Sequence, residues 1–274
     1  TEQWQVNGGL RFDHVESDYQ TSITNLSRTD DLLSWRAGLV FKPLPYGSIY
    51  FGCGTSFNPS IETVTGLALA TNTVNLDPEE TRTYELGTKW DLLKQRLLLT
   101  AAIFHTEKLN ARTPGINPGD PSIVLDGKQI VRGFEVGAVG AITKEWQVFA
   151  GYTFLHTDVE ASNTASEEGA QFSNAPEHSA NLWTTYLLPW NLEIGTGVQY
   201  VGERLNNLSS NANVREAPDY WLFDAMLGYQ ATKQLTLRLN VYNLADERYI
   251  DRVGGGHFVP GPGRSAILTA SLNF

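Results

Sequence analysis

The sequence lacks long apolar runs, and it contains a single cysteine, Cys53. One cysteine excludes an intrachain disulfide and any metal site built from several cysteines. No stretch approaches the roughly 18 apolar residues that a membrane-spanning helix requires, and the mean hydropathy is −0.24. Hydropathy alone would indicate a soluble protein. That inference is unsafe, because a membrane β-barrel alternates lipid-facing and lumen-facing residues and averages out as polar.

An excess of basic residues is also missing. The chain has 20 Lys and Arg against 30 Asp and Glu, for a formal net charge of −10. Phosphate binding needs a basic surface, so we expect no nucleic acid partner. The acidity identifies no other partner, since negative charge also serves solubility. No basic, apolar leader precedes Thr1, so we expect a processed or truncated polypeptide.

Catalytic motifs are absent as well. The histidines lie at positions 14, 105, 156, 178 and 257, and none has a His partner two or four residues away. We therefore expect no zinc site. The Gly-x-Ser-x-Gly elbow of hydrolases does not occur, and Gly254-Gly255-Gly256 lacks the helix and Lys-Ser/Thr of a phosphate loop. We predict no enzyme activity and interpret the histidines as interface or loop residues.

What the chain does contain is period-two alternation of apolar and polar residues from end to end, which predicts β-strands. In one segment Leu237 and Leu239 alternate with Arg238 and Asn240, and charge falls repeatedly on one face only. We predict an all-β protein that forms one domain over residues 1–274. The expected strands, about twelve, are 3–16, 32–43, 47–57, 80–92, 95–110, 124–141, 145–159, 177–188, 191–204, 219–231, 234–249 and 264–274.

The connections between these strands alternate in length. Short turns, such as 93–94 and 143–144, alternate with long loops. The expected long loops are 17–31, 58–79, 111–123, 160–176, 205–218 and 250–263. Short turns on one side and long loops on the other are typical of an outer-membrane barrel whose long loops lie outside the cell.

Strand length supports the same prediction. Soluble strands average about five or six residues, whereas a tilted membrane-crossing strand needs about 9–11. Most of the expected strands exceed ten residues, and Trp and Tyr lie near their ends, where amphipathic rings suit the membrane interface. We therefore predict an antiparallel transmembrane β-barrel segment in contact with outer-membrane lipid.

Charged residues in the middle of these strands are predicted to face the lumen. They are Arg11, Asp13, Arg36, Glu85, Lys89, Glu135, Asp224 and Arg238. The near balance of signs favours pairing between neighbouring strands over a permeation path, because a selective channel favours one sign.

The last third of the chain contains YWLFD at 220–224, LRLNVYNLADERY at 237–249, PGPGRS at 260–265 and the terminal Phe274. In these segments it resembles the C-terminus of TonB-dependent receptors, and within that family the ferric catecholate siderophore receptors. Earlier segments at 9–13, 54–59 and 80–90 are similar to successive barrel strands of the same family, so the likeness spans essentially the whole chain.

The resemblance implies uptake of a ferric siderophore across the outer membrane of a Gram-negative bacterium, driven by the TonB complex. Phe274 resembles the signal read by the barrel-assembly machinery. Family barrels have 22 strands and a plugged lumen. Because we find no plug, no TonB box and no counterpart of about ten strands, we expect the C-terminal portion of such a barrel. An isolated portion leaves two unpaired edges in lipid unless 3–16 pairs with 264–274.

The resemblance also implies a ligand that carries the iron, with no cofactor bound directly. Ferric catecholates are multiply anionic and flat-faced, so cations and aromatic rings suit them. The candidate residues at loop bases are Arg112, Arg204, Arg215, Arg252, His257 and Phe258. Any one of them is also explained as a solvated loop residue.

Two other interpretations stay open at the level of the sequence. A self-standing barrel of about twelve strands would act as a passive pore or an outer-membrane hydrolase. The chain would otherwise be an inactive remnant of a receptor.

Overall fold

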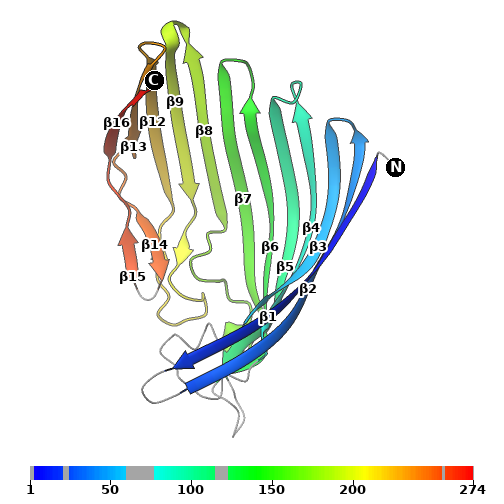
Figure 1. Cartoon of the computed structure of the whole chain (residues 1–274). Coiled ribbons are helices and arrows are strands. Elements are labelled where there is room, and N and C mark those ends of the chain that lie inside the picture. The colour runs from blue at the N-terminus through cyan, green and yellow to red at the C-terminus, as the bar shows by residue number, and fades with distance from the viewer. Residues whose placement is uncertain (1–2, 21–24, 60–76, 115–122, 255–256, 274) are drawn as a thin grey trace.

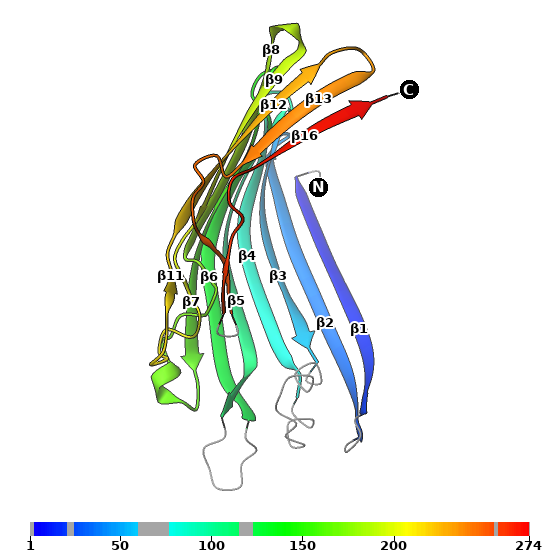
Figure 2. The ribbon, with the colours of Figure 1, turned by 90° about the vertical axis from the view of Figure 1, so that its left-hand side faces the viewer.

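The computed structural model describes residues 3–20, 25–59, 77–114, 123–254 and 257–273. These residues form one antiparallel sheet of twelve strands and two small two-stranded sheets. Figures 1 and 2 show the large sheet as a curved, twisted wall, with β1 and β16 at its two edges. The described residues include no helix long and apolar enough to cross a membrane.

Neighbouring strands of the wall follow one another in the sequence, apart from the two small sheets. The wall consists of β1 (Trp4–Gln20), β2 (Asn25–Leu44), β3 (Gly47–Asn58), β4 (Glu79–Leu92), β5 (Leu97–Pro114), β6 (Ile123–Ala141), β7 (Trp146–Ala161), β8 (His178–Leu188), β9 (Leu192–Val201), β12 (Tyr220–Gln230), β13 (Leu235–Tyr242) and β16 (Ser265–Leu272). In the long connections, β10 (Arg204–Leu205) pairs with β11 (Glu216–Ala217), and β14 (Ile250–Gly254) pairs with β15 (His257–Pro260). The predicted antiparallel sheet of about twelve strands is confirmed.

The register of the ladder sorts the side chains onto two faces, because directly opposed residues on neighbouring strands share a face. Phe51 is opposite Leu86, Leu86 is opposite Ile103, and Ile103 is opposite Phe134. These four side chains are 40–58% exposed. A continuous exposed apolar row of this kind is typical of the lipid-facing wall of a membrane barrel. We call this face the outer wall and the opposite face the inner wall.

Two belts of aromatic rings border the apolar rows of the outer wall. Near the short turns, Trp4 stacks on Phe41 with ring centroids 4.5 Å apart, and Trp90 lies near Tyr46 at 6.3 Å. Nearer the long loops a second belt contains Tyr84, Phe134, Tyr152, Phe154, Tyr200 and Trp221. We call these the turn-side belt and the loop-side belt.

The spacing of the two belts can be compared with the apolar band of an outer-membrane barrel. On β4 the belts are represented by Tyr84 and Trp90, six residues apart. At about 3.3 Å per residue they are separated by about 20 Å along the strand. Because barrel strands are tilted by about 35–45°, this corresponds to about 15 Å along the membrane normal, which lies within the apolar band of about 25 Å found on outer-membrane barrels.

The first expected long loop, 17–31, is largely strand. The pairing of β1 with β2 continues as far as Gln20 opposite Asn25. Beyond the apolar band both faces of a strand meet water, so apolar alternation ends while the backbone ladder continues. Polar cross-strand contacts take over there, as where His14 lies 2.7 Å from Asp31. The expectation was therefore wrong about where this hairpin ends.

Two expected strands are shorter than their sequence patterns suggested. The segments 191–204 and 234–249 leave the wall after Val201 and Tyr242. After Tyr242 the backbone turns sharply, since Asn243 and Asp246 adopt φ of 51° and 56°, a left-handed conformation that Asn and Asp tolerate better than most residues. The expected loop 250–263 in turn contains the hairpin β14–β15.

A glycine substitution tests the packing of the wall. In Gly133→Ala, the new methyl group would collide with the Phe154 carbonyl oxygen and lie 2.7 Å from the Phe104 ring. We expect a loss of about 1–3 kcal/mol of stability, as in other overpacked sites. The measurement is the temperature at which the detergent-solubilised protein loses its heat-modifiable gel migration.

The matched control is Gly8→Ala, because the methyl group there would meet only the Arg36 carbonyl oxygen at 3.6 Å, an ordinary contact. Equal melting temperatures for the two variants would contradict the described packing of β5, β6 and β7.

Candidate functional site

The inner wall contains all eight charged residues that were expected to face the lumen. Tracing opposed pairs from strand to strand places them on the face opposite the apolar rows. The eight are Arg11, Asp13, Arg36, Glu85, Lys89, Glu135, Asp224 and Arg238. That this face lines a closed lumen stays a prediction.

Several of these charges have local partners. Arg11 donates to Asp13 at 2.8 Å, and Arg238 lies 3.9 Å from Glu193. Neither pair joins directly neighbouring strands, which is the arrangement that was expected: Arg11 and Asp13 lie on β1, and Glu193 and Arg238 lie on β9 and β13, on either side of β12. That these charges do not define a charge-selective path stays a prediction.

A groove of about 720 Å³ follows the inner wall over β1 to β4. Glycines open it: a methyl group at Gly87 would collide with the Tyr50 ring, which lies across that position. The Tyr50 hydroxyl donates to Glu85 at 2.6 Å, and the Lys89 ammonium lies 5.3 Å from the centroid of the Tyr50 ring. The groove therefore combines a fixed aromatic ring with two cations, Arg36 and Lys89, and one carboxylate, Glu85.

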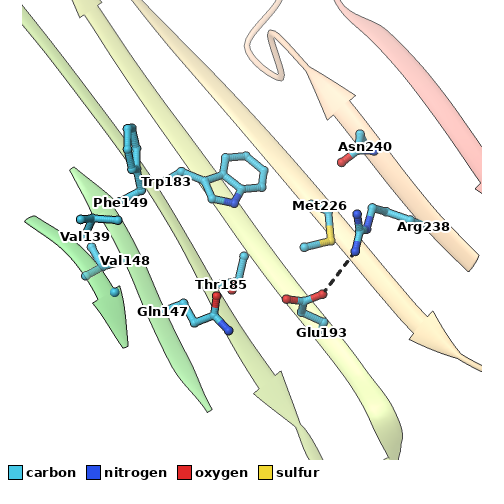
Figure 3. Close-up of a pocket in the computed structure, with 11 residues that line it drawn as sticks. Val139, Gln147, Val148, Phe149, Trp183, Thr185, Glu193, Met226, Arg238 and Asn240 are labelled. Atoms are coloured by element: carbon cyan, nitrogen blue, oxygen red, sulfur yellow. Dashed lines mark ion pairs between the residues drawn. The ribbon is translucent and has the colours of Figure 1, made fainter. Parts of the chain in front are cut away.

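A second hollow, of about 350 Å³, lies on the inner wall near the short turns (Figure 3). Trp183, Phe149 and Met226 surround the ion pair between Arg238 and Glu193. The Trp183 ring covers Gly197 of β9, where an added methyl group would lie 2.7 Å from the ring. Aromatic and polar groups thus converge on both inner-wall hollows.

At the loop ends, Arg204 has a structural role. Its guanidinium is buried, with 5% of the residue exposed, and it donates to the carbonyl oxygens of Ile250 and, at 2.6 Å, Asp251. The guanidinium carbon also lies 5.5 Å from the centroid of the Tyr220 ring, a favourable cation–π arrangement. This corrects the expectation that Arg204 is open to an anionic ligand, because the side chain fixes the start of β14 against β12.

Tyr249 completes this anchor. Its ring packs against Tyr220 with centroids 4.5 Å apart, and the Gly261 backbone passes so close that a methyl group there would collide with the Tyr249 ring. Burial, followed by the negative charge of Asp251, raises the pKa of the Tyr249 hydroxyl above its ordinary value. The phenol therefore stays neutral at physiological pH.

Asn243 anchors the other end of the same connection. It is 4% exposed, and its side-chain amide donates to the carbonyl oxygens of Glu247 at 2.9 Å and Pro262 at 3.2 Å. The amide oxygen accepts from the Glu247 N–H, while the Asn243 N–H donates to the Asp224 carboxylate at 2.8 Å. One inner-wall charge, Asp224, therefore also positions the loop that follows β13.

The remaining ligand candidates are distributed over several elements. Arg252, His257 and Phe258 all lie in the hairpin β14–β15, but the register places Arg252 and His257 on one face and Phe258, which is opposite Val253, on the other. The first two are exposed and Phe258 is half-buried. Arg215 is exposed before β11, and Arg112 is half-buried on β5. The expected assembly signal, Phe274, lies outside the described residues.

Within the described ranges, no three His, Cys, Asp or Glu side chains are grouped so that they could hold a metal ion. The chemistry that the residues do offer is recognition: aromatic faces, guanidinium groups and hydroxyls on the inner wall and at the loop ends.

Comparison with known proteins gives a consistent result. A family model described as TonB dependent receptor-like, beta-barrel, matches residues 1–244. The probable TonB-dependent receptor BfrD of Bordetella pertussis is 37% identical over 296 residues, which cover 100% of this chain and 39% of the relative. The chain thus spans about two fifths of the length of that relative.

Two solved structures are similar over nearly the whole chain. The siderophore receptor PiuA from Acinetobacter baumannii is 35% identical with a TM-score of 0.89, over 99% of this chain and 41% of that protein. The closed form of the ferric-catecholate import receptor Fiu from Escherichia coli K12 is 29% identical with a TM-score of 0.87, over 100% of this chain and 43% of that protein.

A glycine at position 243 tests the loop anchor. Asn243→Gly keeps the left-handed backbone free of strain but removes three side-chain hydrogen bonds at a buried site. We expect about 1–3 kcal/mol less local stability and at least tenfold faster proteolytic cleavage within 243–263. The protein should keep its heat-modifiable migration.

Asn211→Gly, in an exposed turn, is the control. If 243–263 is cleaved at the same rate in both variants, Asn243 does not anchor the loop.

Proposed function

Because the chain belongs to the TonB-dependent receptor β-barrel family, we propose that it forms a twelve-strand part of the barrel wall of an outer-membrane receptor for ferric siderophores. The observation that carries this proposal is the match of the whole described wall to siderophore receptors of which it covers 41–43%. The self-standing barrel does not fit that match, since the similar proteins are larger barrels of which this wall is one portion.

The membrane position follows from the outer wall. Exposed apolar rows lie between the turn-side and loop-side belts, as on a lipid-facing surface. The backbone groups of these strands are paired within the ladder, which hydrocarbon requires because it holds no water to bond them. The long connections, including β14–β15, would lie outside the cell and the short turns in the periplasm. The barrel-assembly machinery would insert the receptor.

The proposed ligand is a ferric catecholate, which one similar structure, Fiu, is described as importing. Such a ligand is anionic and flat-faced, and one hairpin carries the exposed cation Arg252 together with the rings of His257 and Phe258. The iron enters as part of this ligand, and TonB supplies the energy through a part of the receptor outside this chain. The wall would perform no covalent chemistry.

Loss of two exposed arginines tests ligand binding. In the receptor that contains this chain, we expect Arg215→Ala combined with Arg252→Ala to weaken binding of the iron(III) complex of dihydroxybenzoic acid about tenfold, through loss of charge-assisted contacts. The measurement is quenching of tryptophan fluorescence on titration. Uptake of radioactive iron from the same complex should stop in cells that lack TonB.

The matched control is Arg82→Ala, which removes a guanidinium from the outer wall, where it is paired with Glu80 at 2.8 Å. Unchanged affinity in the double variant would place ligand recognition elsewhere. Uptake that continues without TonB would refute the receptor function itself.

A further inference from the structure

One polar rung crosses the outer wall at the loop-side edge of the apolar band. Tyr84 is opposite His105, His105 is opposite Arg132, and Arg132 is opposite His156. Phe134 lies two residues from Arg132 on the same strand and face, within the loop-side belt. Arg132 is thus an exposed cation where hydrocarbon gives way to lipid headgroups.

Other outer-wall cations at this level have carboxylate partners. Arg82 lies 2.8 Å from Glu80, and Lys128 lies 3.3 Å from Glu107 and 3.0 Å from a second carboxylate. Across the part of the chain that the structure describes, no carboxylate lies within 4.0 Å of the Arg132 guanidinium. Unlike Arg82 and Lys128, Arg132 therefore carries a positive charge that no nearby described carboxylate balances.

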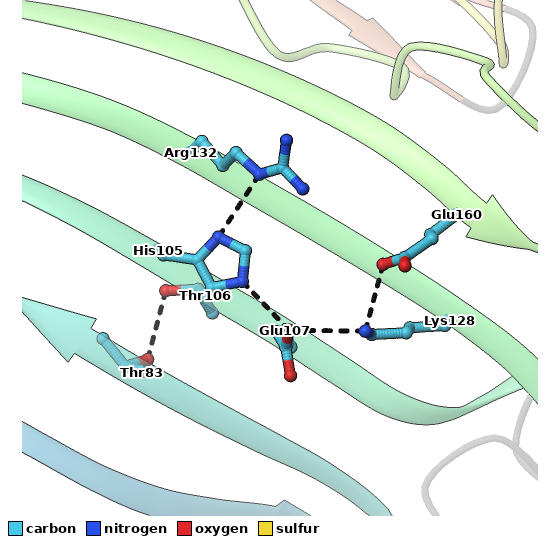
Figure 4. A network of polar contacts seen from close by, with 7 residues as sticks. All are labelled: Thr83, His105, Thr106, Glu107, Lys128, Arg132 and Glu160. Atoms are coloured by element: carbon cyan, nitrogen blue, oxygen red, sulfur yellow. Dashed lines mark hydrogen bonds and ion pairs between the residues drawn. The ribbon is translucent and has the colours of Figure 1, made fainter.

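The neighbouring side chains fix the orientation of that guanidinium (Figure 4). Arg132 Nε donates to His105 Nδ1 at 3.3 Å, and His105 Nε2 lies 3.0 Å from the Glu107 carboxylate. Because Nδ1 accepts, Nε2 carries the proton and donates to Glu107. Among the described residues, the hydrogen bond of the Arg132 side chain is made by Nε, and in Figure 4 its two terminal nitrogens point away from the network. Two parallel N–H groups in that geometry match a phosphate.

We propose that Arg132 binds a phosphate group of an outer-leaflet lipid. This inference rests on the proposed membrane position. A charge at the edge of hydrocarbon is costly unless an anion or water compensates it, and lipid phosphates are the anions at that depth. A lipid is favoured over free phosphate because its acyl chains would cover the apolar surface of Phe134 and Ile103 directly below, which are 40% and 58% exposed. His156, on the other side of Arg132, offers a further ring nitrogen to the headgroup.

The test uses the complete receptor, stripped of lipid and held in a phosphate-free detergent. It is titrated with lipid A, the phosphorylated glycolipid of the outer leaflet, with dephosphorylated lipid A, and with inorganic phosphate, and bound lipid is counted by native mass spectrometry. We expect Arg132→Gln to weaken lipid A binding about tenfold, as the loss of a hydrogen-bonded charge does. The lipid A affinity of Arg132→Lys should lie between those of the parent protein and Arg132→Gln. Arg82→Gln should bind lipid A within about twofold of the parent protein.

Equal binding by the parent and Arg132→Gln, or equal binding of phosphorylated and dephosphorylated lipid, would overturn the proposal. So would displacement of lipid A by an equal concentration of inorganic phosphate, which would indicate a site for the free anion. Heat-modifiable migration of Arg132→Gln confirms that it folds. Failure of the siderophore function would appear separately, as loss of iron uptake in the parent protein.

Discussion

The structure depends on the continuity of its backbone ladder. Inside a bilayer every strand N–H and C=O must find a partner in the protein, because water is absent. Ten of the twelve wall strands have neighbours on both sides, whereas β1 and β16 each have one described neighbour. Both edges therefore need partners in a bilayer, and the coverage of 41–43% of the similar proteins accords with further strands at each edge.

The same ladder determines the chemistry of both faces. A slip of one residue between two strands would move every side chain to the opposite face. The observed register places Glu85 and Arg238 on the inner wall, and it places Phe134 and Arg132 on the outer wall. The positions of the inner-wall hollows and of the exposed apolar rows are thus set by one pattern of hydrogen bonds. The loop after β13 is joined to that pattern through Asp224 and Asn243.

The sequence predicted the wall well because its information is local. Alternation such as Leu237, Arg238, Leu239 indicates both a strand and its two faces, and all eight inner-wall charges could be assigned in this way. Alternation ends where both faces meet water, so the continuation of β1 and β2 beyond the apolar band gave no signal.

The role of Arg204 was out of reach for a different reason. Its partners lie 46 and 47 residues away and are backbone carbonyls, which carry no residue-specific signal. The rung of His105, Arg132 and His156 likewise requires two strand registers at once. The motif around Asn243 was visible as a family resemblance, but the hydrogen bonds that explain it were not.

Cysteine cross-linking across the two edges tests most directly whether this wall is part of a larger barrel. The variants are made in the complete receptor with Cys53 replaced by Ser. Each carries one cysteine at a position of β1 between Val6 and Phe12 and a second cysteine at Ile267 or Leu268 of β16. The control pairs, Leu239 with Leu268 and Asn240 with Ile267, join strands that are adjacent in the ladder, and one of them is of the closely spaced kind. We expect the controls to form disulfides and no pair between β1 and β16 to do so. Efficient cross-linking of β1 to β16 would show a barrel that closes on itself and would contradict the placement of this chain in a larger receptor.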